Sequence, residues 1–166
     1  AEPTLAAEAA YRGDMSVFEY ASMLPTQQVC SEVCTRAAKE GHVDLLKLAR
    51  SKGYPWDEWT AASLAFRGDL ETLQWARAQQ PPIPWSPYTY DLAARHGHLH
   101  VMIWVQTQGL KIYTLAVDRA AEGGHTAVIQ WLHSKGIRSD ALACALAAGR
   151  SEEHTSELQS RLHLVC

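Results

Sequence analysis

Five copies of one glycine-centred pattern run along this chain and constrain its fold more than any other feature. Each copy places two small or apolar residues and two variable residues before a glycine, and successive glycines are 28, 27, 29 and 27 residues apart. Self-similarity at such a period indicates a repeat protein, in which each unit buries its apolar surface only against its neighbours. The five repeat glycines are Gly13, Gly41, Gly68, Gly97 and Gly124.

The pattern stops near residue 150. A sixth copy begins at Ala147-Ala148-Gly149, but the residues from Arg150 onward do not continue it. Residues 150–160 resemble, residue for residue, a translated short-read sequencing adapter, and 163–166 fit the same reading frame. We therefore expect a repeat array over 1–149, with about five repeats and a truncated sixth, and an adapter-derived, non-native tail over 150–166. A natural polar C-terminal helix is the alternative. Foreign segments are left out of fold reasoning, so we assemble no metal site from Glu152, Glu153, His154, His163 and Cys166.

Charge and hydropathy argue against several classes of protein. Without the tail, 13 Lys and Arg stand against 15 Asp and Glu, so the array lacks the basic surface that nucleic-acid binding requires. No apolar run approaches the roughly 18 residues that span a bilayer. Residues 1–10 carry Glu2 and Glu8 where a secretion signal would be basic and then apolar. We therefore expect an intracellular, cytoplasmic monomer that binds neither nucleic acid, nor a membrane, nor a small-molecule substrate.

The cysteines give no framework for disulfides or metal. Three lie before the tail, Cys30, Cys34 and Cys144, which is an odd number. Cys30 and Cys34 would share one face of a helix, yet no second His or Cys pair completes a zinc site. We expect reduced, buried cysteines, with no metal and no cofactor.

Each repeat is expected to be a pair of helices joined at the glycine, as in 89–96 followed by 99–108. Glycine suits the junction because a helix commonly ends in the left-handed backbone region, which glycine adopts without steric cost. Asp14 and Asp69 follow their glycines and should cap the second helix at its N-terminus. Histidine takes that place in the other copies, where a ring nitrogen can bond a backbone group at the helix boundary; these residues are His42, His98 and His125.

Apolar periodicity indicates how the helices pack. The second helix of each repeat has apolar residues at the 3.6-residue period, and the seventh residue after each glycine is large. We expect these large residues to stack into a continuous core: Tyr20, Leu48, Trp75, Trp104 and Trp131. Alanine pairs on the first helix should let neighbouring helices approach closely, as at Ala37-Ala38, Ala93-Ala94 and Ala120-Ala121.

The order Ala-Ala-x-x-Gly-His followed by an apolar helix and a closing glycine resembles the second half of the ankyrin repeat. The resemblance covers 4–149 and is strongest to a short, tryptophan-containing variety, whose linker is matched at 53–60 and more weakly at 84–89. It implies an all-α, ankyrin-like solenoid of stacked antiparallel helix pairs with short linkers. These units are about five residues shorter than the usual period of about 33, so we expect stunted or absent β-hairpins. The family's Thr-Pro-Leu-His start is also missing, so its hydrogen bonds are not carried over.

The resemblance implies a non-catalytic scaffold that binds a protein partner through its concave face, formed by the linkers and the first helices. Aromatic residues and arginine there are typical of interface hot spots. The residues expected on this face are Trp56, Glu58, Phe66, Arg67, Trp85, Tyr88, Arg95, His96, Tyr113 and Glu122. Trp56 and Trp85 have a second interpretation, in which they pack over the shortened linkers and seal the joint between repeats.

Two other functional classes remain open. An enzyme is poorly supported, because the alternating His96, His98 and His100 straddle a helix junction and only Asp91 lies close in sequence. No phosphate loop, nucleophile motif or carboxylate pair is present, so we assign no catalytic residue. The array could instead be a structural spacer or targeting segment of a larger protein whose catalytic domain lies elsewhere. Its aromatic-rich linkers favour binding over a spacer.

Overall fold

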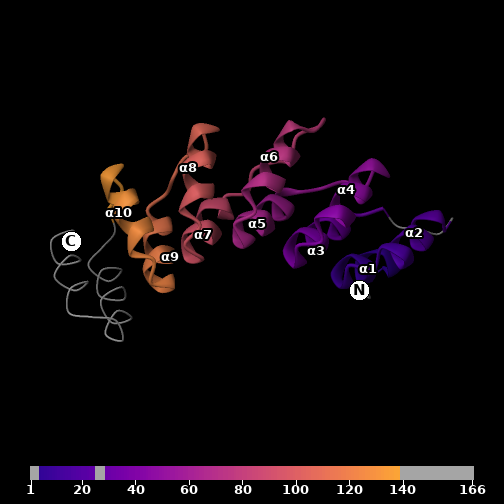
Figure 1. Cartoon of the computed structure of the whole chain (residues 1–166). Coiled ribbons are helices and arrows are strands. Elements are labelled where there is room, and N and C mark those ends of the chain that lie inside the picture. Colours follow the sequence, from indigo (N-terminus) through magenta and orange to yellow (C-terminus); the bar gives the residue numbers. More distant parts are fainter. Residues whose placement is uncertain (1–3, 25–28, 139–166) are drawn as a thin grey trace. The chain divides into compact units, whose positions relative to one another are not determined.

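The computed structural model describes residues 4–24 and 29–138, and within them it is all-helical, with ten helices and no strand. The tail over 150–166 and the start of the sixth repeat lie outside the described residues. Figure 1 labels the helices in chain order. Their bounds are α1 Leu5–Arg12, α2 Met15–Met23, α3 Glu32–Glu40, α4 Val43–Ser51, α5 Glu58–Arg67, α6 Leu70–Ala78, α7 Tyr88–Arg95, α8 Leu99–Thr107, α9 Leu115–Gly123 and α10 Thr126–Ser134.

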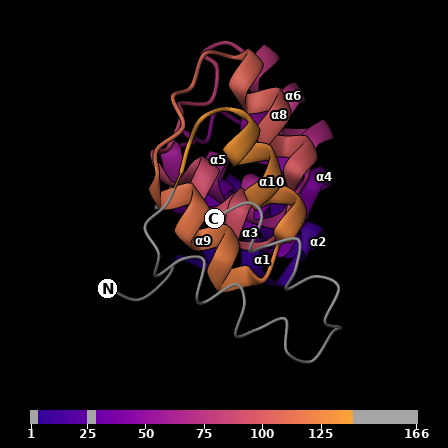
Figure 2. The same cartoon turned by 90° about the vertical axis from the view of Figure 1, so that its left-hand side faces the viewer.

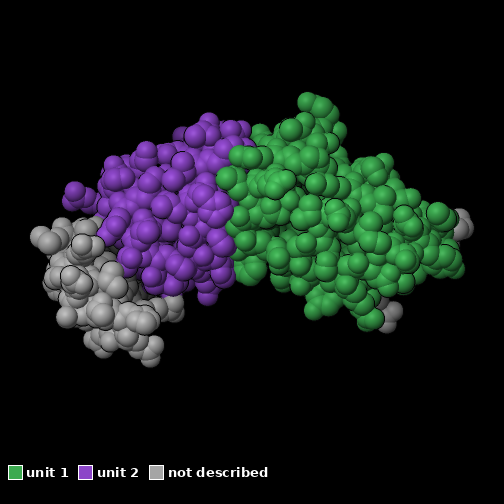
Figure 3. All heavy atoms as spheres, viewed as in Figure 1, with its two compact units in different colours: residues 1–86 green, residues 87–166 purple. Residues whose placement is uncertain are grey.

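The chain divides into two compact units, residues 1–86 and 87–166, coloured green and purple in Figure 3. In unit 1 the first helices of successive repeats pack side by side, α1 against α3 and α3 against α5. Each also packs against the second helix of its own repeat, so α2, α4 and α6 form a second layer, as Figures 1 and 2 show. Unit 2 repeats the arrangement, with α7 packed against α9, α8 against α7 and α10 against α9.

The repeat glycines end the first helices in the left-handed backbone region, as the sequence predicts. Their φ angles lie between 73° and 83° in all five copies. The residue after each glycine donates its backbone N–H to a carbonyl five residues back, as His42 does to Ala37 at 2.8 Å. This bond closes the end of the helix. The linker glycines Gly53, Gly109 and Gly136 also have positive φ.

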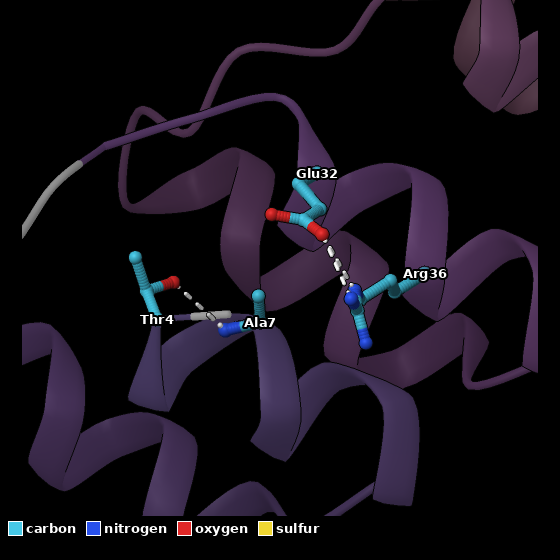
Figure 4. A network of polar contacts seen from close by, with 4 residues as sticks. All are labelled: Thr4, Ala7, Glu32 and Arg36. Carbon is cyan, nitrogen blue, oxygen red and sulfur yellow. Dashed lines mark hydrogen bonds and ion pairs between the residues drawn. The ribbon is translucent and has the colours of Figure 1, made fainter. Parts of the chain in front are cut away.

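Aspartate side chains cap the second helices where the sequence predicts it, whereas the histidine side chains do not cap their own helices. Asp14 Oδ1 accepts from the backbone N–H of Val17, and Asp69 Oδ1 accepts from that of Thr72, each at 3.0 Å. Thr4 caps α1 in the same way by accepting from Ala7 at 3.2 Å (Figure 4). The histidines stand at the N-cap positions of α4, α8 and α10 but make no capping bond with their own helix.

Alanines of the first helices and apolar residues of the second helices form the core. The alanine pairs preceding Gly41, Gly97 and Gly124, which the sequence predicts at close helix contacts, are buried, and so is the pair preceding Gly13. On the second helices, the fully buried side chains stand mostly four, five and eight residues after the glycine, as Leu45, Leu46 and Ala49 do.

The seventh residue after each glycine does not form the continuous core that the sequence analysis expects. Tyr20 is 63% exposed, and its counterparts Leu48, Trp75, Trp104 and Trp131 are only half-buried. At 100° per residue, the seventh position lies about 100° around the helix from the centre of the buried stripe. These large side chains therefore line the edge of the core.

No helix among the described residues is long and apolar enough to cross a membrane.

Cys34 is buried and Cys30 is half-buried, and both are free thiols. Burial raises the pKa of the Cys34 thiol to about 12, against the smaller effect of Arg50. The Cys34 thiol is therefore protonated and unreactive at neutral pH.

Candidate functional site

One face of every first helix is exposed at the same positions. Residues nine and two positions before the repeat glycine are exposed in most copies, and the residue five before it is half-buried. These three positions are four and three residues apart, so they lie on one side of an α-helix. We call them the first-helix face. In unit 1 it consists of Thr4, Glu8, Tyr11, Glu32, Arg36, Lys39, Trp59, Ser63 and Phe66, and in unit 2 of Tyr88, Leu92, Arg95, Leu115, Arg119 and Glu122.

In unit 1 this face carries exposed aromatic rings beside ion pairs. Trp59 is 50% exposed and Phe66 is 36% exposed, one at each end of α5. The Arg36 guanidinium lies 5.9 Å from the centre of the Tyr11 ring, which joins the faces of α1 and α3. Arg36 also forms an ion pair with Glu32 on its own helix at 2.8 Å (Figure 4). Aromatic rings and arginine are the side chains most enriched at protein interfaces.

In unit 2 the same positions carry Tyr88 and Arg95 on α7, and Leu115 and Glu122 on α9. Tyr88 is 47% exposed, and Arg95 is exposed at the other end of α7. The Arg119 Nη1 atom donates to both carboxylate oxygens of Glu122 at 2.9 Å, which neutralises that acid. Tyr113, in the linker that leads to α9, is 60% exposed. The face therefore continues from the helices onto this linker.

The linker tryptophans of unit 1 pack under arginines. Trp56 is only 8% exposed, its ring lies 4.0 Å from the Arg50 guanidinium, and it meets Trp75 edge-on at 5.9 Å. Arg50 Nη1 also donates to the Tyr54 carbonyl oxygen at 2.7 Å. Arg50 therefore fixes both the Trp56 ring and the linker backbone two residues before that ring. This burial favours the packing interpretation of Trp56.

The next repeat of unit 1 uses the same device. Arg77 lies 4.8 Å from the centre of the Trp85 ring and donates from Nη1 to the Ile83 carbonyl oxygen at 2.6 Å. Trp85 is half-buried. Arg50 and Arg77 both stand nine residues after their repeat glycine, a regularity that identifies the pairing in the sequence once the contact is known. A half-buried ring contributes less to a binding surface than Trp59 does.

The equivalent linker of unit 2 is held without arginine. Tyr90 Oη donates to the Leu110 carbonyl oxygen at 3.3 Å, and burial raises the pKa of Tyr90 to about 12. Tyr90 stands seven residues before its repeat glycine, as Cys34 does in unit 1. Cys34 Sγ likewise donates to a linker carbonyl oxygen, that of Tyr54, at 3.9 Å. The residue seven before the glycine therefore supports the linker in both units.

A hydroxyl-rich cluster starts α5. Asp57 Oδ1 accepts from the backbone N–H of Thr60 at 3.1 Å and from Thr35 Oγ1 of the preceding repeat at 3.0 Å. Burial alone would raise the pKa of Asp57, but hydrogen bonds from Ser31, Thr35 and Thr60 outweigh it and lower that pKa below its usual value. Asp57 is thus a charged cap that also ties α3 to the following linker. The neighbouring Glu58 is exposed at the first turn of α5.

Bonds across the joints between repeats give His42, His125 and Arg67 a structural role. His42 Nε2 donates to the Tyr11 carbonyl oxygen at 3.2 Å, two residues before Gly13. Arg67 Nη1 donates to the Lys39 carbonyl oxygen at 3.3 Å, two residues before Gly41. Because a carbonyl oxygen only accepts, His42 must carry its proton on Nε2. The helices α1 and α3 thus each have one terminal carbonyl bonded by the next repeat.

Unit 2 contains the same joint. His125 Nε2 donates to the Arg95 carbonyl oxygen at 3.0 Å, two residues before Gly97. A Cβ atom on Gly97 would come within 2.5 Å of the His125 ring. A Cβ atom on Gly13 would likewise clash with the His42 ring, and one on Gly41 would clash with the Arg67 guanidinium. Gly13, Gly41 and Gly97 therefore serve two needs, a left-handed backbone and room for a side chain of the next repeat.

The three alternating histidines of unit 2 form a row at the α7–α8 turn. The ring centres of His96 and His98 are 6.3 Å apart, and those of His98 and His100 are 5.9 Å apart. Partial burial, with the nearby charges of Arg95 and His125, lowers the pKa of His96. No group of three His, Cys, Asp or Glu among the described residues is arranged to hold a metal ion.

The structure separates the predicted binding residues into two sets. The exposed set lies on the first-helix face or the adjoining linker, at Phe66, Tyr88, Arg95 and Tyr113, or beside that face, at Glu58, Arg67 and His96. The second set is engaged within the chain: Trp56 and Trp85 pack against arginines, and Glu122 is ion-paired. Sequence reasoning missed Trp59 and Tyr11. The signal for Trp59 was present, because Trp59 precedes Phe66 by seven residues just as Tyr88 precedes Arg95, and that spacing keeps helical side chains on one face.

Comparison with known proteins adds no assignment for this face. No family model matches the chain, and no curated protein matches it.

Proposed function

We propose that this chain is a non-catalytic scaffold that binds a protein partner through the first-helix face. The observation that carries the proposal is the recurrence of exposed aromatic and charged side chains at the same positions of successive first helices, with Trp59 and Phe66 on α5 and Tyr88 and Arg95 on α7. Rings of this size supply much buried area at little entropic cost, and they are enriched among hot-spot residues.

We propose further that the helix pairs stack as ankyrin repeats do, in a variety with short linkers. Two features of the described residues support this assignment. The first helices pack on one another within each unit. At three joints a residue next to the repeat glycine bonds the end of the preceding first helix, namely His42, Arg67 and His125. In an ankyrin stack the first helices and linkers form the concave binding surface, which would place Trp59 and Phe66 on it.

A structural spacer is the second candidate, and one observation favours it. Trp56 and Trp85, the aromatic residues that first suggested binding linkers, are used to hold those linkers in place. A spacer would keep these packing contacts and would not need exposed rings on the first helices. The two candidates therefore differ in what the exposed rings Trp59 and Phe66 do.

The test removes the exposed rings without touching the core. The double variant Trp59→Ser, Phe66→Ser is compared with a control that carries Glu71→Ser and Gln74→Ser, at exposed positions of α6 on the other layer of unit 1. A partner is captured from source cells with the unaltered chain, purified and titrated against all three proteins by calorimetry. We expect the ring variant to bind at least about tenfold more weakly, since a lost hot-spot ring costs about 2 kcal/mol or more.

The control should bind as the unaltered chain does, and circular dichroism should show equal helicity for all three proteins. If the partner binds the ring variant and the unaltered chain equally, the first-helix face of α5 is not the binding surface. If no purified protein binds the unaltered chain directly, the spacer interpretation replaces the scaffold.

A further inference from the structure

Charge is divided unevenly between the two units. Among the described residues, 87–138 carry five Lys and Arg against three Asp and Glu, whereas 4–24 and 29–86 carry eight against ten. Unit 2 is thus net positive over this range, although the whole chain has a formal net charge of −3. A net charge of one sign on a binding unit raises the local concentration of partners of the opposite sign.

Of the three acids described in unit 2, Asp91 is buried and Glu122 is ion-paired. Asp91 is only 9% exposed, and both carboxylate oxygens of Glu122 receive the Arg119 guanidinium. Arg95 and Lys111 are exposed, and neither forms an ion pair within the part of the chain that the structure describes. The positive charge on this surface is therefore available to an outside carboxylate.

Contacts within unit 2 join the elements that carry these cations to the elements that carry exposed apolar side chains. The bond from Tyr90 to the Leu110 carbonyl attaches the linker that carries Lys111 and Tyr113 to α7, the helix that carries Tyr88 and Arg95. Leu115 is exposed at the position on α9 that Tyr88 has on α7, and these two helices pack together. Helix axes in contact are about 8–10 Å apart. We call this surface the basic aromatic face; it consists of Tyr88, Arg95, Lys111, Tyr113 and Leu115.

The helix dipole explains only part of this charge. Arg95 lies in the last turn of α7, where a cation stabilises the negative end of the helix. Lys111 lies in a linker outside any helix and has no such role. Tyr88 and Arg95 are seven residues apart on α7, so ring and guanidinium are separated by about 10 Å along the axis. That distance corresponds to about three residues of an extended peptide.

We propose that the basic aromatic face of unit 2 binds an acidic segment of the partner protein, in which aliphatic or aromatic side chains alternate with carboxylates. The carboxylates pair with Arg95 and Lys111, and the apolar side chains pack on Tyr88, Tyr113 and Leu115. This inference rests on the proposed scaffold function and adds the chemistry of the partner to it.

A random peptide library displayed on phage tests the proposal on the whole chain. Selected peptides are resynthesised and titrated by fluorescence polarisation against the unaltered chain and two double variants. Arg95→Glu, Lys111→Glu alters the basic aromatic face. Lys135→Glu, Arg138→Glu makes the same change in net charge at exposed positions after α10. This second variant therefore controls for the effect of the protein's net charge on binding. We expect the selected peptides to be rich in Asp and Glu with interspersed apolar residues. The variant of the basic aromatic face should bind them at least about tenfold more weakly than the control variant does.

The other outcomes separate the two proposals. Enriched peptides that are neutral or basic, or that bind both double variants equally well, would overturn the acidic partner and leave the scaffold function standing. Failure to enrich any peptide on the unaltered chain would count against both. If a short single-stranded oligonucleotide binds more tightly than the selected peptides and depends on the same two cations, nucleic acid replaces the acidic protein segment as the occupant.

Discussion

The repeat glycine does more than end a helix. At Gly97 the φ of 76° already disfavours any residue with a Cβ atom, and that atom would also press into the His125 ring. Gly109 has a similar φ of 81°, but a Cβ atom there would meet nothing within 4 Å. The two positions therefore separate backbone strain from packing between repeats.

Substituting alanine at each position measures the two contributions. We expect Gly109→Ala to cost about 1 kcal/mol from the left-handed backbone alone. Gly97→Ala should cost about 3 kcal/mol, because displacement of the histidine ring adds about 1–3 kcal/mol. Urea unfolding followed by circular dichroism measures both. Equal losses would mean that the His125 ring moves aside freely and that the joint is not tightly packed.

Asp57 gives the stability of unit 1 a dependence on pH. Its pKa in the folded chain is lowered below the ordinary 3.8, because bonds from Ser31, Thr35 and Thr60 outweigh burial. The unfolded chain therefore takes up a proton first as the pH falls, so the contribution of Asp57 is full well above pH 3.8 and is lost as the pH drops through its folded pKa.

Asp57→Asn should therefore lower stability at pH 7 and lessen its decline toward acid. Thermal unfolding at a series of pH values between neutral and acid checks this, with Glu58→Gln at the exposed next residue as the matched control. An Asp57→Asn variant whose stability declines with pH as steeply as that of the unaltered chain would contradict the lowered pKa.

The linkers are stabilised by repeated side-chain contacts, although they contain no regular structure. In unit 1 an arginine nine residues after the glycine holds both a tryptophan ring and a backbone carbonyl. In unit 2 the equivalent position is Gln106, and Ile112 stands where the linker tryptophan would be. The arginine and the tryptophan are thus replaced together, and Tyr90 bonds the linker carbonyl instead.

Arg50→Ala should destabilise unit 1 by about 2–3 kcal/mol. It removes a charged hydrogen bond to the Tyr54 carbonyl and a cation–π contact with the buried Trp56 ring, each worth about 1–2 kcal/mol. Lys52→Ala, two residues later and exposed, is the control and should change stability by less than about 0.5 kcal/mol. Urea unfolding monitored by tryptophan fluorescence compares them. A loss below about 1 kcal/mol for Arg50→Ala would show that the linker is held by other contacts.

Which residues of a helix are buried was only partly predictable. The 3.6-residue period correctly identified the apolar second helices, but it did not distinguish the centre of the buried stripe from its edge. Tyr20 and Trp75 were assigned to the core because they are large, and the structure places them at its margin. Size and periodicity describe one helix, whereas burial depends on what the neighbouring helices cover.

Stability should be local along each unit, because a repeat contacts mainly its neighbours. In unit 1 His42, at the turn between α3 and α4, bonds the end of α1, whereas Arg77 holds the linker after α6. The two sites share no contact partner among the interactions described. Arg50 and Trp56, in contrast, touch each other directly.

Double-variant cycles test this locality. The losses from His42→Ala and Arg77→Ala should add to within about 0.5 kcal/mol, whereas Arg50→Ala and Trp56→Ala should cost less together than the sum of their separate losses. Urea unfolding of the four single and two double variants provides the energies. Strong coupling between His42 and Arg77 would indicate that unit 1 behaves as one undivided core.

The sequence by itself determined the repeat length, the helix pairs, the left-handed glycines and the aspartate caps. The repeat length follows from the recurrence of the glycine pattern, and the other features depend on backbone preferences and hydrogen bonds that act within about five residues, so a local pattern contains them. Only the tertiary structure decided that Trp56 is buried while Trp59, three residues later, is exposed, and that His42 and Arg67 bond carbonyls 31 and 28 residues away. Exposure and bonding of that kind depend on contacts across a whole repeat, which no local pattern specifies.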